Sequence, residues 1–195
     1  MAHETKARRP SVFINIPYVK AYELYELAIW VVLHAHDMDP KILKDIGPAH
    51  ARLVHLVNRI RDCDYGISDF SMSRGNIILE HGLMLSEVQF GHRTDRLRVV
   101  GMIDDARRIP IELSDLQGYD FIVHGWDTGC LIQELTKWIR TNCREAKPVK
   151  SIERLVDLFE DLSLKYRSRY GYARTSSFYE THGPSFRDKY RRLLG

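Results

Sequence analysis

Several familiar signatures are missing from this chain of 195 residues, and each absence excludes a class of protein. Neither GxGxxG nor GxxxxGK[ST] occurs, which argues against a classical dinucleotide dehydrogenase and against a nucleotide-phosphate transferase. There is no GxSxG elbow, which disfavours an α/β-hydrolase. Internal repeats and low-complexity segments are also missing, so repeat architectures are not expected.

Long apolar runs are lacking as well. No run approaches the ~20 residues that a membrane span needs, and residues 1–10 lack the apolar core of a signal peptide. We therefore expect a cytoplasmic protein with no membrane partner. The three cysteines form no CxxC pair and no metal-ligand spacing, so we expect idle or buried thiols and no bound metal.

The composition is that of an ordinary globular protein, with 44% apolar and 28% charged residues. The length suits one domain plus an appendage. A net charge of +3 is too small to indicate nucleic-acid binding by itself.

Apolar segments of strand type alternate with segments of helical spacing. Strands are predicted over 11–16, 65–69, 97–103 and 120–124, with a weaker candidate within 37–44, where Asp39-Pro40 is unfavourable. Helices are predicted after residue 18, over 49–61, over 76–90, from Asp127 or Thr128 to about Cys143, and after Pro148. The order predicts an α/β protein with a three-layer, flavodoxin- or Rossmann-like parallel sheet of about five strands. Residues 11–146 would form this domain, and residues 147–195 a helical extension with a tail.

Two carboxylates stand out in the stretch 65–84. Asp69 ends a predicted strand, and Glu80 lies about one turn inside the following helix. Ligands of open parallel sheets bind beyond the carboxyl ends of the strands, so both acids can face one pocket. Cleavage of a glycosidic bond uses such a pair. The alternatives are a turn or cap role for Asp69 and an exposed helix position for Glu80.

This stretch resembles the nucleoside 2-deoxyribosyltransferase-like group and its relatives, the nucleotide N-hydrolases and the TIR-like NAD-cleaving domains. In those proteins a strand ends in Asp, and a helix presents Glu within a pattern like Tyr/Phe-Glu-Leu-Gly. Here the counterparts are Asp69 and the run 79–82, in which His81 replaces the usual Leu. Residues 12–18 resemble the first strand and ligand loop of that superfamily. Residues 120–125 resemble a run in bacterial TIR-like proteins of unassigned function.

The resemblance covers about residues 11–143 and implies cleavage or exchange of an N-glycosidic bond in a nucleoside, a nucleotide or NAD. It makes Glu80 the catalytic nucleophile or the stabiliser of an oxocarbenium-like carbon. Asp69, the second catalytic candidate, would bind a sugar hydroxyl or steer a proton. NAD or a nucleotide would be a substrate, and no cofactor is expected. The alternative is a non-catalytic TIR-like module that senses a nucleotide, as in antiphage defence.

Polar residues near the strand tips and the helix start are candidate substrate contacts. Phosphate is favoured at a helix start by free backbone N–H groups, although Ser71, Ser73 and Asn76 can instead cap the helix. Tyr18 and Lys20 can equally be surface residues. The full set of candidate contacts is Asn15, Tyr18, Lys20, Ser71, Arg74, Gly75, Asn76 and His124.

The final thirty residues, 166–195, mix arginines with tyrosines and phenylalanines. This composition suits binding of single-stranded nucleic acid, an arm that wraps a neighbouring subunit, or an extension packed on its own domain. Nucleic acid is the less favoured of these. Related enzymes build their sites across subunit contacts, so a homo-oligomer is expected.

Overall fold

The structure is a computed structural model that describes residues 8–42, 49–72, 74–91, 97–105, 109–111, 113 and 120–170. The tail beyond Tyr170 lies outside the described residues. No helix in the described ranges combines the length and apolar character needed to cross a bilayer.

Five strands form one sheet in the order β2-β1-β3-β4-β5, and all the paired neighbours run parallel. The predicted α/β class and parallel sheet are confirmed. The strands are β1 (Ser11–Asn15), β2 (Asp39–Lys41), β3 (Tyr65–Asp69), β4 (Arg98–Ile103) and β5 (Ile122–Val123).

Strand β2 forms even though it contains Pro40. It is an edge strand, where a residue without an N–H is tolerated. The strand pairs with β1 through Ser11 opposite Asp39, and the Asp39 N–H donates to the Pro10 carbonyl at 2.8 Å. The Asp39-Pro40 pair therefore does not prevent this strand from forming.

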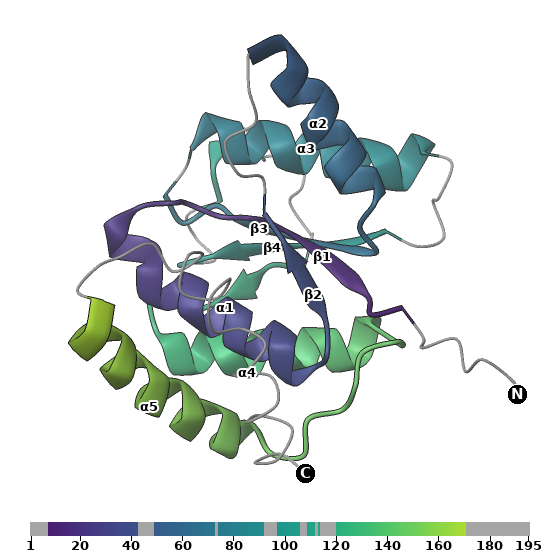
Figure 1. Ribbon diagram of the computed structural model, residues 1–195. Coiled ribbons are helices and arrows are strands. Elements are labelled where there is room, and N and C mark those ends of the chain that lie inside the picture. The colour runs from purple at the N-terminus through teal and green to yellow at the C-terminus, as the bar shows by residue number, and fades with distance from the viewer. Residues whose placement is uncertain are drawn as a thin grey trace, which may run out of the picture.

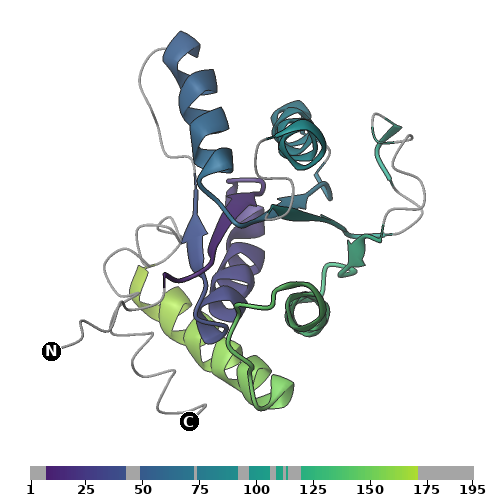
Figure 2. The ribbon, with the colours of Figure 1, turned by 90° about the vertical axis from the view of Figure 1, so that its right-hand side faces the viewer.

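Helices cover both faces of the sheet (Figure 1). Helices α2 and α3 lie on one face, and α1 and α4 lie on the other, with α5 packed against α1 and α4. Figure 2 shows α3 and α4 end-on, on opposite sides of the sheet. The helical elements are the 3₁₀ turn η1 (Lys20–Tyr22), α1 (Glu23–Ala35), α2 (Ala49–Arg61), α3 (Gly75–Phe90), α4 (Thr128–Asn142) and α5 (Ile152–Tyr170).

Helix α1 is the most deeply buried of these helices. Every residue from Glu26 to His34 is buried, because α1 lies between the sheet and α5. Leu155, Phe159 and Leu162 of α5 belong to the same hydrophobic cluster as α1. The helix predicted after Pro148 is therefore present and is part of the main core.

The strand order changes direction at β1 and β3, which lie side by side although β2 follows β1 in the chain. In sheets of this order, ligands bind beyond the carboxyl ends of the strands at that point. Asn15 ends β1, and Ser68 and Asp69 end β3. The fold thus brings these candidate residues to the expected ligand edge.

Candidate active site

Asp69 is completely buried at the end of β3 and holds three other segments in place. Its Oδ1 accepts the Ser71 N–H at 2.8 Å. Its Oδ2 accepts the Tyr22 hydroxyl and lies 3.1 Å from Nε2 of His124. Hydrogen bonds to an ionised acceptor are about twice as strong as neutral ones. One carboxylate thus ties η1, the β3–α3 loop and the end of β5 together.

His124 is buried beside Asp69 with a defined tautomer. The Trp126 N–H donates to Nδ1 of His124 at 3.2 Å, so the ring proton lies on Nε2. This N–H faces both Asp69 Oδ2 at 3.1 Å and Ser71 Oγ at 2.9 Å. A nucleophilic triad needs its acid and its hydroxyl on opposite ring nitrogens. Ser71, His124 and Asp69 share one nitrogen and do not form such a triad.

Asn15 faces the interior rather than a ligand. It is 1% exposed, and its Nδ2 donates to Ser68 Oγ at 3.1 Å and to the Ile77 carbonyl at 2.8 Å. The same Ser68 Oγ lies 3.0 Å from Nδ1 of His81. Burial lowers the pKa of His81 to about 4, so this imidazole is neutral near pH 7. Asn15 therefore fixes the first turn of α3 against the strand tips.

Glu80 keeps contact with solvent, because its side chain is only partly buried. Burial raises the pKa of Glu80 to about 6, and the positive charge of Arg52 on α2 opposes that shift. A carboxyl group with a pKa near the working pH can exchange protons and still ionise.

A second acid, Glu26, acts electrostatically on the same tyrosine as Glu80. Burial raises the pKa of Tyr18, and the charges of Glu26 and Glu80 raise it further. The Tyr18 hydroxyl points inward and donates to the Ile14 carbonyl at 3.0 Å, while Tyr18 as a whole is 50% exposed. Glu26 is buried near the start of α1. The sequence pattern did not single it out, since an acid there also suits the helix dipole.

The two predicted catalytic acids do not contact each other. The hydrogen-bond partners of Asp69 are Tyr22, Ser71 and His124, and none of the interactions among the described residues joins Asp69 to Glu80. A contact between Asp69 and a sugar stays a prediction. In this structure the carboxylate positions other side chains and has no exposed surface.

The start of α3 and the segment after β1 are exposed at several of the candidate positions. Lys20, Arg74, Gly75 and Asn76 are exposed there. The N-cap of α3 is Arg74, whose side chain makes no capping hydrogen bond. Among the described residues, Ser71 contacts Asp69 and His124 and neither Ser71 nor Asn76 caps the helix, so that alternative is wrong for these two residues. Ser73 lies outside the described residues. Asn76 also makes no hydrogen bond to Glu80 within the part of the chain that the structure describes.

Aromatic rings gather next to this edge, a feature that the sequence analysis missed. Tyr25 lies 5.2 Å from Trp126 and 5.6 Å from His124 between ring centroids, and Tyr22 lies 5.3 Å from Tyr25. Trp126 is 39% exposed and has a φ of +56°, which is unfavourable for a bulky residue. Its Nε1 donates to Asp104 at 3.0 Å, which helps to hold this conformation. The signal available was the spacing of Tyr18, Tyr22 and Tyr25 after the first strand.

No protein-family model matches this chain, and a search of curated proteins finds no match either. The resemblance to the deoxyribosyltransferase-like and TIR-like proteins therefore stays a prediction based on the residues. Among the described residues, no three His, Cys, Asp or Glu side chains gather in a way that could hold a metal ion.

Proposed function

We propose that the protein cleaves the N-glycosidic bond of a nucleoside, a nucleotide or NAD, with Glu80 acting on the anomeric carbon. As the bond to the base breaks, its electron pair leaves with the base and the sugar carbon becomes positively charged. An ionised Glu80 stabilises that carbon or bonds to it, and water or a second base then completes the reaction. The compartment we propose is the cytoplasm.

The observation that carries this proposal is the setting of Glu80. The side chain is partly buried at the edge of the sheet where ligands bind in this fold, and its pKa is raised to about 6. A carboxylate that is partly stripped of water interacts more strongly with a developing positive charge. Exposed Arg74 and the backbone N–H groups in the first turn of α3, which the Arg74 side chain does not cap, supply the positive end that a phosphate group favours.

A second candidate function is nucleotide sensing without catalysis. The full burial of Asp69 favours it, because the strand-tip acid is then unavailable to the sugar. In this case the same edge binds the nucleotide, and Glu80 contributes charge but no chemistry.

Incubation of the full chain with NAD and with a panel of nucleoside monophosphates separates the two candidates. Release of free base is followed by chromatography for the wild type, for Glu80→Gln and for Glu160→Gln. Glu160 is a suitable control because it is an exposed acid on α5, a helix that packs on α1 and α4. Catalysis predicts base release by the wild type and by Glu160→Gln, and its loss in Glu80→Gln.

Binding of a nucleotide by the wild type without any release of base would support sensing and reject catalysis. Release of free base by Glu80→Gln at the wild-type rate would show that Glu80 has no catalytic role. Because Glu80 is partly exposed and makes no hydrogen bond within the described part of the chain, the Gln variant is expected to fold.

A further inference from the structure

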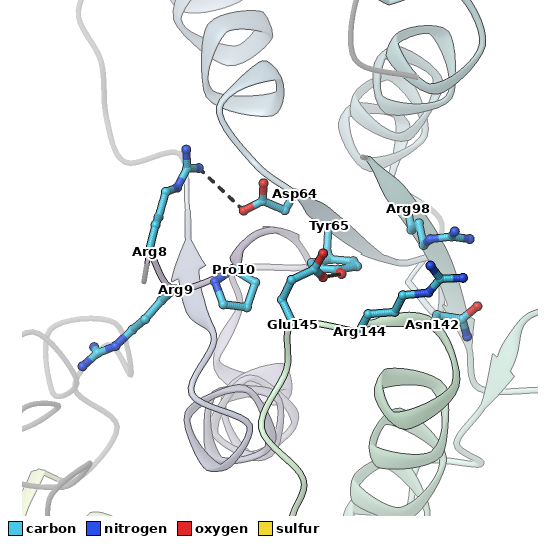
Figure 3. Close-up of a pocket in the computed structure, with 9 residues that line it drawn as sticks. All are labelled: Arg8, Arg9, Pro10, Asp64, Tyr65, Arg98, Asn142, Arg144 and Glu145. Atoms are coloured by element: carbon cyan, nitrogen blue, oxygen red, sulfur yellow. Dashed lines mark hydrogen bonds and ion pairs between the residues drawn. The ribbon is translucent and has the colours of Figure 1, made fainter. Parts of the chain in front are cut away.

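A separate pocket of about 410 Å³ opens at the opposite edge of the sheet, where the strands begin (Figure 3). Its lining includes Asp64 and Tyr65 at the start of β3 and Arg98 at the start of β4. Asn142, Arg144 and Glu145, from the end of α4 and the segment after it, complete the side near Arg98. Small-molecule sites have volumes of roughly 300–1,000 Å³, so this pocket is of sufficient size for one.

The two acids of the pocket are already engaged by protein groups. Oδ2 of Asp64 accepts the Ser11 N–H at 2.8 Å and the Ser11 hydroxyl at 2.9 Å, and it lies 3.6 Å from the Arg8 guanidinium. The Glu145 carboxylate accepts the Tyr65 hydroxyl, which lowers the pKa of Glu145. The carboxylates of Asp64 and Glu145 are thus both bound by residues other than Arg98.

Arg98 and Arg144 form no ion pair with any residue that the structure describes. Within the described ranges, neither guanidinium has a carboxylate within 4.0 Å, although Glu145 lies close enough to Arg144 for the charge of Arg144 to lower its pKa. Arg98 acts electrostatically on Cys143, the residue between Asn142 and Arg144. Figure 3 shows Arg98, Arg144 and Asn142 together on one side of the pocket.

Two like charges on one wall repel each other, and an anion between them would offset that repulsion. Guanidinium groups match the geometry of phosphate oxygens and can donate two parallel hydrogen bonds to them. The Asn142 side chain adds an amide donor. The rest of the pocket, towards Tyr65 and Glu145, has space and an acceptor for a hydroxyl-bearing group.

We propose that this pocket binds a phosphorylated small molecule, whose phosphate lies between Arg98 and Arg144. The site is distinct from the edge that carries Glu80, because the two lie at opposite ends of the strands. The proposal therefore does not depend on the glycosidase activity.

The test is a calorimetric titration of the full chain with a hexose monophosphate, which has no base and no N-glycosidic bond, and with inorganic phosphate. The wild type, the double variant Arg98→Gln/Arg144→Gln and the control Arg154→Gln are compared. Arg154 is an exposed cation on α5 and does not line the pocket. We expect saturable binding of the hexose phosphate, tighter than that of inorganic phosphate, weakened roughly tenfold or more in the double variant and unchanged in the control.

Absence of saturable binding, equal affinity for inorganic phosphate, or unchanged affinity in the double variant would overturn the proposal. If the double variant does not fold, the single variant Arg144→Gln provides the same comparison, because Arg144 is exposed and lies outside the helices and strands. Loss of binding in Arg154→Gln to the same degree would show a general effect of charge and would also reject the site.

Discussion

The Tyr22 hydroxyl donates a hydrogen bond to Oδ2 of Asp69, and both residues are fully buried. The two residues are 47 positions apart in the chain, so this bond joins the start of the first helical segment to the tip of the central strand. Burial and the Asp69 carboxylate both raise the pKa of Tyr22, which keeps the phenol protonated as a donor.

Replacement of Tyr22 by Phe is expected to lower the free energy of unfolding by roughly 1.5–3 kcal/mol, because Asp69 loses a donor in a buried site. Urea unfolding monitored by circular dichroism measures the change. Tyr25→Phe is the matched control, since the Tyr25 hydroxyl donates to the exposed Trp126 carbonyl. An equal decrease in the free energy of unfolding of the two variants would show that the buried Tyr22–Asp69 bond stabilises the protein no more than the exposed one.

The rate of base release is expected to fall as the pH drops below about 6, because Glu80 acts in its ionised form and its pKa is raised to about 6. The charge of Arg52 lowers this pKa, so Arg52→Gln should move the midpoint to higher pH. Arg59→Gln, on the same helix, serves as the control. If the wild type and Arg52→Gln had the same pH profile, Glu80 would not be the group whose ionisation controls the rate.

Acid is expected to destabilise the protein through its buried histidines. Burial lowers the pKa of His81 and of His36 to about 4, although the bond to the Lys147 carbonyl opposes the shift at His36. The unfolded chain binds these protons near pH 6.5. The stabilisation from each neutral ring is therefore complete above pH 6.5 and is lost as the pH falls from 6.5 towards 4.

The expected loss is roughly 2 kcal/mol for each ring between pH 7 and pH 5. Urea unfolding at the two pH values tests this, with His81→Leu as the comparison, because leucine cannot take up the proton. An unchanged dependence on pH in His81→Leu would show that this ring does not contribute.

Cys130 is expected to react with Ellman's reagent much faster than the other two thiols under native conditions. Burial raises the pKa of Cys63 and of Cys143 to about 12, which leaves almost no thiolate. Cys130 is only partly buried. The fast phase should disappear in Cys130→Ser, and a fast phase that persists in that variant would contradict the burial of the other thiols.

Much of the fold could be predicted from the sequence because its local patterns are strong. The strand at 65–69 and the helix at 49–61 have the predicted bounds, and Asp127 caps α4 by accepting the Cys130 N–H. The alternation of strands and helices was sufficient for the parallel sheet. Strand β2 was harder to predict, since its pairing with β1 offsets the unfavourable local effect of Pro40.

The site was less predictable because its contacts join distant parts of the chain. The sequence located Asp69 and His124 at strand ends, but their bond spans 55 positions and buries both side chains. Acidic residues are seldom fully buried, so exposure of Asp69 was the natural expectation. That Glu26 on α1 and Glu80 on α3 both act electrostatically on Tyr18 depends on how these helices pack, which no local pattern encodes.

The position of α1 between the sheet and α5 limits how far the protein can be shortened. A cut after residue 146 would expose to water the side of α1 that packs on α5, whereas the sides on the sheet and on α4 would stay covered. Such a fragment would tend to aggregate, whereas a protein that ends after Tyr170 keeps the covering helix. The smallest piece that can be handled in isolation therefore extends beyond the predicted domain boundary and includes all of α5.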